Sequence, residues 1–452
     1  MPVNRWLARG RAALLLEPWF TPFTLVNGAG VGLAPILLPL DAARYGVGHV
    51  GLVMGAFNLG ALAAPFAGDL ADRYHAYRPL ATAFAAVMAV ALWLFPWVGP
   101  AGQVPLGLAE GAGFAAALTV ANLLIVERRP KAQWNVRLAS LETTLGVGQA
   151  GALFMAAWLS GLTPRSALGI GAIMPAAAIP LALYLIPRLR AADHRVVSSP
   201  APAASPATAP GPAGALPGAT PPAPAPVSHR FASIGHVGEW GPSPSRRHPR
   251  RGHQTPADVA ALLRGGLGWM LAAWIPSYAG TAVVFSLYPV LFLHAFGIAT
   301  TTSALAFAVI VFVSLPLYIV AGRACQRRGP ARAIAGALAS RVILLSALAA
   351  FAAAGHVAAA LPLACFAGIM FAWSFLSVAS PAFTGLLKPD AEGDAQGLLN
   401  AGSGLAGVLG SVAGGLIASQ WGYPAALAAG AGAVLLGLVI FIATALRRRN
   451  SK

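Results

Sequence analysis

Long apolar runs alternate with short polar loops along most of the chain. A helix needs about 20 mostly apolar residues to cross the roughly 30 Å hydrocarbon layer of a bilayer. By this criterion a first set of spans lies near residues 20–40, 47–67, 79–98, 105–126, 138–160 and 166–187. A second set lies near residues 267–293, 300–321, 333–354, 359–385, 397–419 and 424–446. The pattern predicts an all-α polytopic membrane protein with about twelve transmembrane helices.

A segment of different composition separates the two sets of spans. Residues 191–256 contain a long Pro/Ala run, which ends near Pro226, and a basic cluster from Arg246 to Arg251. Dense proline prevents helix propagation, and few large apolar residues remain to be buried. We therefore predict an N-terminal six-helix bundle (1–190), a disordered linker (191–256) and a C-terminal six-helix bundle (257–452). The basic end of the linker is interpreted as solvated, with contact to anionic lipid head groups as the alternative.

Composition supports a chain whose outer surface faces lipid. Of all residues 57% are hydrophobic and only 10% are charged, and the mean hydropathy is +0.70. Soluble proteins carry roughly a quarter charged residues. The net charge of +17 would favour a nucleic-acid partner in a soluble protein. Because the basic residues occupy predicted loops and the linker, we expect no nucleic-acid partner here.

The basic residues gather on one side of the predicted membrane. If the spans alternate in direction, that side holds the clusters at 5–11, 73–78, 128–137, 323–332 and 447–452. The other side holds only Arg44 and Arg165. Positively charged loops stay in the cytoplasm, so we predict a multi-pass protein of the inner (plasma) membrane with both termini cytoplasmic. The stretch before Pro18 is too short and too polar for a signal peptide and predicts a surface helix.

The sequence lacks the motifs of several catalytic classes. None of the three lysines (Lys131, Lys388 and Lys452) follows a glycine, so a phosphate-binding Gly-Lys-Ser/Thr loop is missing. The cysteines, Cys325 and Cys365, have no metal-ligand or redox spacing. Neither HExxH nor GxSxG occurs. We therefore expect a protein that is not an enzyme and that holds no cofactor or metal.

Parts of the two halves resemble each other. Gln133, Ser140 and Trp158 match Gln396, Ser403 and Trp421, and Gly68, Arg73 and Arg78 match Gly322, Arg327 and Arg332. Each stretch occupies the same place in its half, after an even shift of six spans. The halves are therefore predicted to be parallel repeats about an axis along the membrane normal.

Residues 68–78 read Gly-Asp-Leu-Ala-Asp-Arg-Tyr-His-Ala-Tyr-Arg and lie between the second and third spans. This stretch resembles the loop signature of the major facilitator superfamily, and the repeat with its central linker fits that family over nearly the whole chain. The resemblance implies a secondary transporter that works by alternating access. It also implies a cytoplasmic gate motif formed by Gly68, Leu70, Asp72, Arg73 and Arg78, with Gly322 and Arg327 in the second copy.

The gate motif also has a direct physical interpretation. Gly68 would let two helix ends approach closely, and Asp72 would cap a helix or pair with Arg73 or Arg78. In the alternative interpretation this loop only specifies topology and stability.

Polar residues near the middle of their spans are candidates for a substrate cavity between the halves. The candidates are Asn27, Asn58, Asn122, Gln149, Tyr278, Tyr288, Trp373 and Asn400. Because a buried amide needs a hydrogen-bond partner, each has a second interpretation as part of helix packing. Glycine-rich fifth and eleventh spans indicate close helix contacts as well.

Ionisable residues inside spans are candidates for coupling, since they are unfavourable in lipid. They are Glu110, Glu142 and Arg341. We expect Glu110 about 8 Å inside span four, and all three away from the membrane midplane. Because burial disfavours an ionised carboxylate, proton coupling through Glu110 or Glu142 is a hypothesis.

These observations predict a monomeric secondary transporter that moves a small molecule across the bilayer. Export of an amphipathic or hydrophobic solute follows from the aromatic candidate residues and from the expected lack of a charge at mid-membrane. Import of a neutral solute such as a sugar is the alternative within this class. A non-transporting sensor or scaffold that recruits a partner through its linker is the alternative from another class.

Overall fold

The computed structural model describes residues 17–128, 134–187, 265–355, 357–388 and 392–450, together with residue 263. Every regular element in these ranges is a helix. A helix satisfies its backbone hydrogen bonds internally, which lipid requires of any spanning segment. The predicted linker (191–256) and the predicted surface helix before Pro18 lie almost wholly outside the described residues.

The N-terminal half contains six helical rods. They are η1–α3 with η3 (Pro18–Phe20, Thr21–Asn27, Gly28–Leu33, Ala34–Ala42, Ala43–Tyr45), α4–α5 with η4 (Val47–Gly60, Ala61–Ala63, Ala64–Tyr74), α6 with η5 (Tyr77–Leu94, Phe95–Trp97), α7 (Pro100–Arg128), α8 (Trp134–Leu159) and α9 (Pro164–Leu185). In the first rod, η2 (Gly28–Leu33) is a π-helical turn that packs against α8. A Cβ atom at Gly28 would lie 2.8 Å from the Gly148 carbonyl oxygen, so this contact requires glycine.

The C-terminal half repeats the pattern with two breaks. Its elements are α12 (Gly266–Phe296), α13 (Thr300–Ser314), α14 (Leu317–Arg328), α15 (Pro330–Ala354), α16 (Ala360–Leu387) and α17 (Glu392–Asn450). The axes of α13 and α14 differ by 47° across a break next to Pro316. In α17 the chain turns at Gly422, whose φ of 83° suits glycine, and Pro424 follows.

The helices agree with the predicted fold class. Within the described residues, nine helices are long and apolar enough to cross a membrane, or ten if α13 and α14 form one broken span. One of these, Ala395–Thr444, contains the predicted span 397–419 and nearly all of the predicted span 424–446. The more polar α8 is not among the nine, although it covers the predicted fifth span. Each of the twelve predicted spans therefore coincides with a helical segment.

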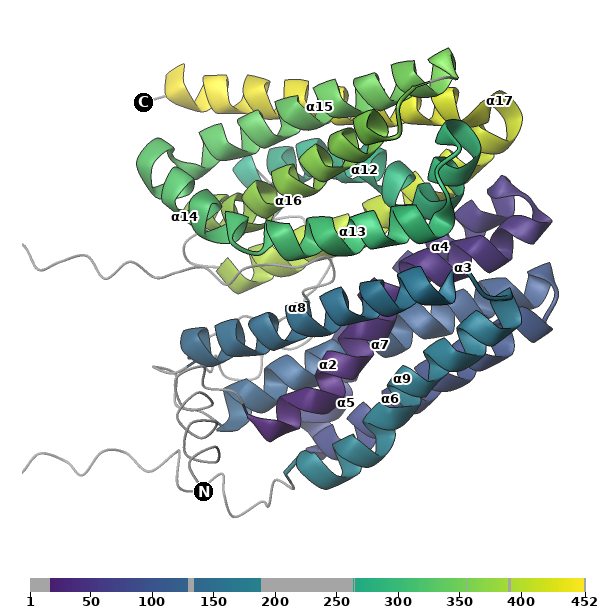
Figure 1. Cartoon of the computed structure of the whole chain (residues 1–452). Coiled ribbons are helices and arrows are strands. Elements are labelled where there is room, and N and C mark those ends of the chain that lie inside the picture. Colours follow the sequence, from purple (N-terminus) through teal and green to yellow (C-terminus); the bar gives the residue numbers. More distant parts are fainter. Residues whose placement is uncertain are drawn as a thin grey trace, which may run out of the picture.

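The two halves pack side by side as separate groups of helices (Figure 1). We call the end of the bundle with the α5–α6 and α14–α15 connections the basic end, because it carries the arginines Arg73, Arg78, Arg323, Arg327, Arg328 and Arg332. The other end carries the α3–α4 and α12–α13 connections, and we call it the opposite end. The main contacts between the halves join α4 to α17, α8 to α13 and α3 to α12.

Candidate functional site: a cavity between the two halves

The two halves touch at the opposite end of the bundle, where α4 meets α17. A Cβ atom at Gly51 would lie 2.5 Å from the carbonyl oxygen of Ser411 and 2.8 Å from the Cα atom of Gly415. A Cβ atom at Gly415 would lie 2.7 Å from the Cα atom of Gly51. Glycine at both positions therefore allows the two backbones to come into direct contact.

A network of polar side chains joins the halves next to this contact. The amide of Asn58 donates hydrogen bonds to the Ser411 hydroxyl at 3.1 Å and to the Met54 carbonyl at 2.9 Å. The Ser411 hydroxyl also hydrogen-bonds to the hydroxyl of Ser286. Asn58 belongs to the N-terminal half, whereas both serines belong to the C-terminal half. The network therefore links the halves on the side of the cavity near the opposite end.

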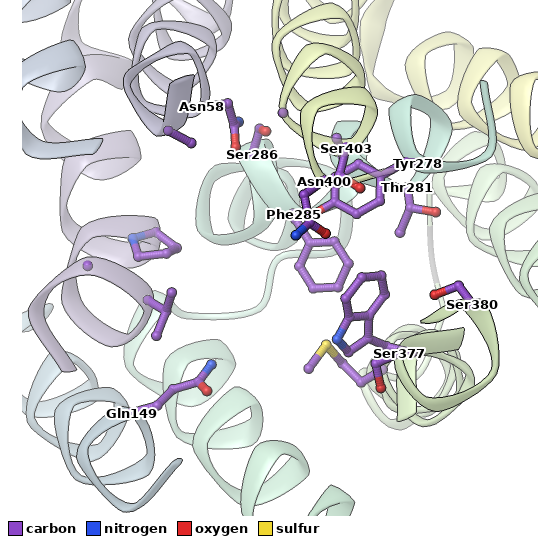
Figure 2. A pocket seen from close by; sticks show the side chains of 18 of the residues that line it. Asn58, Gln149, Tyr278, Thr281, Phe285, Ser286, Ser377, Ser380, Asn400 and Ser403 are labelled. Carbon is purple, nitrogen blue, oxygen red and sulfur yellow. The ribbon is translucent and has the colours of Figure 1, made fainter. Parts of the chain in front are cut away.

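A cavity of about 220 Å³ lies between the halves at mid-depth. On α17 its lining residues run from Gln396 to Gly404, at the start of the helix and thus toward the basic end. The α4–α17 contact at Gly415 lies further along the same helix. The cavity thus extends from mid-depth toward the basic end and is closed at the opposite end. In Figure 2, Gln149 approaches it from the N-terminal half, while Phe285 and Asn400 face it from the C-terminal half.

The lining is largely apolar and aromatic, with separate polar groups. Aromatic members are Phe57, Phe114, Trp274, Tyr278, Phe285, Phe307, Tyr318 and Trp373. The indole N–H of Trp274 donates to the Ser403 hydroxyl at 2.7 Å. The Gln396 amide donates to the Asn400 side-chain oxygen at 3.2 Å. Such a lining suits a ligand with an apolar body and a few polar groups.

Arg341 also lines this cavity, close to the middle of α15. Its side chain is almost fully buried, and its Nη1 atom donates to the Thr281 hydroxyl at 3.1 Å. The guanidinium lies 5.3 Å from the centroid of the Trp373 ring. The expectation that no charge lies at mid-membrane was therefore wrong.

The family is decided by comparison over the whole chain. The profile of the major facilitator superfamily matches residues 20–380 and, separately, residues 270–452. The chain belongs to the major facilitator superfamily. The resemblance of the loop at 68–78 is thus confirmed by a match that covers both halves.

Solved structures of other transporters have a similar fold. The nucleoside transporter NupG is 13% identical with a TM-score of 0.69, covering 95% of this chain and 98% of that chain. A bacterial homolog of the human lysosomal transporter Spinster, in an inward-facing and occupied conformation, is 12% identical with a TM-score of 0.65, covering 96% of both chains. The human organic anion transporter MFSD10 is 16% identical with a TM-score of 0.55, covering 94% and 98%. At these identities the likeness concerns the fold alone. No curated protein sequence matches the chain.

In this major facilitator chain, five of the eight candidate cavity residues line the cavity. They are Asn58, Gln149, Tyr278, Trp373 and Asn400. The rings of Tyr278 and Trp373 meet edge to face, with centroids 5.7 Å apart. That these residues bind a solute stays a prediction.

The other three candidates lie away from the cavity. The amide of Asn27 donates to the Leu145 carbonyl at 2.9 Å, and Asn122 is buried in α7. The Tyr288 hydroxyl donates to the Ser303 carbonyl at 2.7 Å, and its ring centroid lies 4.2 Å from that of Phe366. Asn27 and Tyr288 thus have the packing role that was the alternative for each candidate.

Several lining residues were not singled out from the sequence, above all on α12. Trp274, Tyr278, Thr281 and Phe285 all line the cavity and recur every three or four residues. This spacing places them on one face of a helix. The recurrence was visible in the sequence, although only Tyr278 was singled out. Ser286, Ser377, Ser380 and Ser403 were missed because serine is common inside apolar helices.

The two carboxylates considered for coupling differ in their surroundings. Glu110 lies about 15 Å from the start of α7 at 1.5 Å per residue, deeper than expected. It is 1% exposed, and neither carboxylate oxygen has a hydrogen-bond partner among the described residues. Its neighbour Gly111 lines the cavity, but Glu110 does not. Glu142, on α8, is buried and does have a partner.

The gate motif lies at the basic end, on α5 and the start of α6. A Cβ atom at Gly68 would be 3.4 Å from the Thr119 methyl group, an ordinary contact, so no described helix approaches Gly68 closely in this state and its role in the gate stays a prediction. A Cβ atom at Gly322 would meet nothing within 4 Å, and Leu70, Arg73 and Arg327 are exposed. Arg78 is half-buried. The Asp72 side chain lies outside the described part of the structure, so its pairing stays a prediction.

No group of three or more metal-binding side chains comes together within the described ranges. Cys325 and Cys365 are both free.

Proposed function

We propose that this protein is a secondary active transporter that moves a small amphipathic solute by alternating access. The observation that carries the proposal is the cavity between the halves, which the α4–α17 contact closes at one end. In alternating access, the halves rock about a central site that faces one side at a time. Contacts confined to one end, such as Gly51 against Gly415, are suited to opening while the basic end closes.

The orientation of this state follows from the distribution of positive charge. Arginines crowd the basic end, whereas Arg44 and Arg165 lie at the opposite end. Since basic loops remain in the cytoplasm, the basic end is cytoplasmic and both termini are inside. The cavity then faces the cytoplasm of a bacterial-type inner membrane. In this state a solute would enter from inside and leave after the α4–α17 contact opens.

The chemical nature of the lining supports an amphipathic solute, and export is part of the proposal as its direction. Eight aromatic rings with scattered amides and hydroxyls favour a ligand with an apolar body. The related solved structures include a nucleoside transporter and an organic anion transporter, so one fold carries different solutes. The cavity lining, and not the fold, therefore supports the choice of solute here.

Proton coupling through Glu110 is part of the proposal. A carboxylate ion without a partner is very unfavourable in a medium of low polarity. Glu110 would therefore hold a proton in this state and release it when rocking admits water.

Flux measurement in proteoliposomes tests the transport function. A thermal-shift screen would first identify a solute, since ligands that bind the folded state raise its stability. The purified protein would then be reconstituted into liposomes that are loaded with this solute in radiolabelled form. We expect saturable flux that empty liposomes lack. A variant without residues 200–250 serves as the control for the scaffold alternative, and it should keep its flux. Binding without flux in any lipid or gradient would contradict the proposal.

A further inference from the structure

The cavity contains a cation with no anion beside it. Arg341 is 1% exposed, and it is the only charged side chain among the described residues that line the cavity. Within the described ranges it takes part in no ion pair. An unpaired buried charge is strongly unfavourable, so a site of this kind favours whatever brings the missing counter-charge.

The hydrogen-bond donors of Arg341 are only partly used. Nη1 donates to Thr281 at 3.1 Å, whereas Nε and Nη2 have no partner among the described residues. Nε and Nη2 share one edge of the guanidinium, where their N–H bonds are nearly parallel. That edge matches the two oxygens of a carboxylate, the bidentate pairing that arginine makes best.

Two neighbours hold the guanidinium in place. Thr281, on α12, fixes the Nη1 side, and the ring of Trp373, on α16, lies 5.3 Å from the guanidinium carbon. A cation over an indole face is attracted by the ring. With its position fixed from two other helices, Arg341 needs little reordering to accept an anion.

We infer that Arg341 anchors the transported solute through an anionic group, so that the substrate is a small monoanion, most simply a monocarboxylate, with an aromatic or aliphatic body. A single cation in the lining balances a single negative charge. The rings of Trp274, Tyr278 and Phe285 supply the surface for the body. A cavity of about 220 Å³ limits the solute to a small molecule. This inference rests on the proposed transport function and gives it a substrate class.

A matched set of probes tests the charge requirement. Phenylacetate, phenylacetamide and phenethylamine share one body and carry a negative, a neutral and a positive end at neutral pH. Their binding to the full chain in phosphatidylcholine nanodiscs would be measured by isothermal titration calorimetry. We expect phenylacetate to bind more tightly than the amide by about 10- to 100-fold, which is the effect of a charge-assisted pair. Equal affinities, or no saturable binding of phenylacetate in the millimolar range, would overturn the inference.

Variants then assign the preference to Arg341. Arg341→Gln should lose the preference for acid over amide, and Arg341→Lys should keep part of it, because lysine keeps the charge but not the planar fork. The control is Arg323→Gln, which removes an exposed arginine from α14. A purely structural arginine would behave differently. In that case Arg341→Gln would lower the melting temperature but leave the acid-to-amide ratio unchanged, and the inference would fall.

Flux assays separate this inference from the proposed function. If the chain transports a neutral solute and Arg341→Gln does so equally well, transport stands and the anionic substrate class falls. If acid-selective binding persists in a chain that never shows flux, the anion site stands and the transport proposal falls.

Discussion

Gly51 and Gly415 bring two backbones from different halves into contact, with a Cβ at either position only 2.7 to 2.8 Å from the other Cα. The contact lies at the end of the bundle opposite the arginine-rich loops. Small residues allow such an approach. Because no hydrophobic effect drives helices together in lipid, their association depends on close packing. The closed state at this end therefore depends on these two positions having no side chain.

Gly51→Leu should prevent this closed state. Its side chain has no room between α4 and α17, so the halves must separate at the opposite end. We expect solute flux to fall by at least about tenfold, equivalent to about 1.4 kcal/mol in the balance of the two states. A cysteine at Ser411, buried in this structure, should then react with an impermeant maleimide added outside. Gly432→Leu is the control, because a Cβ there meets nothing within 4 Å. Normal flux in Gly51→Leu would contradict the assigned closure.

A disulfide between positions 48 and 419 should lock the same contact. A Cβ atom at Gly48 would lie 3.7 Å from the Cβ atom of Ser419, within the range that disulfides need. In a background with Cys325 and Cys365 replaced by serine, the double variant Gly48→Cys/Ser419→Cys should lose flux on oxidation. Reduction with dithiothreitol should restore it. Each single variant serves as the control, and oxidised protein with full flux would show that this contact need not open.

Much of the architecture could be predicted from the sequence because lipid imposes strict requirements. A spanning segment must be long, apolar and helical, so continuous apolar runs marked each helical segment in advance. Breaks inside spans were not predicted. The 47° bend between α13 and α14 lies next to Pro316, a residue that could have indicated it, whereas the π-helical turn η2 packs against α8. A sequence pattern does not contain that packing.

The candidate site was predicted less completely than the fold. A polar residue in an apolar run stands out, which is how Asn58 and Gln149 were found. Asn27 and Tyr288 stand out equally, yet they face neighbouring helices. The direction of a side chain depends on helix rotation within the bundle, which a single sequence does not give. The depth of Arg341 was misjudged for a different reason: the predicted span began at residue 333, whereas α15 begins at Pro330, so Arg341 lies about three turns along the helix.

Tyr288→Phe should lower stability without changing the site. The variant keeps the ring contacts with Phe366 and Phe307 but leaves the Ser303 carbonyl without the phenolic donor. Loss of one buried hydrogen bond costs about 1 to 2 kcal/mol. Thermal melting of the purified protein in detergent should show the loss. The apparent affinity for solute should stay at the wild-type value. A weakened affinity would indicate that Tyr288 contributes to the solute site.

Glu110→Gln should separate proton coupling from solute movement. If the buried carboxyl carries the proton, the amide variant should keep downhill flux and exchange but lose accumulation driven by a pH gradient. Both are measured in the same proteoliposomes, with and without an imposed gradient. Glu142→Gln is the matched comparison, because Glu142 is also buried but already has a partner. If Glu142→Gln lost gradient-driven accumulation and Glu110→Gln kept it, the coupling role would belong to Glu142. Gradient-driven accumulation that survives in both variants would remove Glu110 and Glu142 from the coupling mechanism.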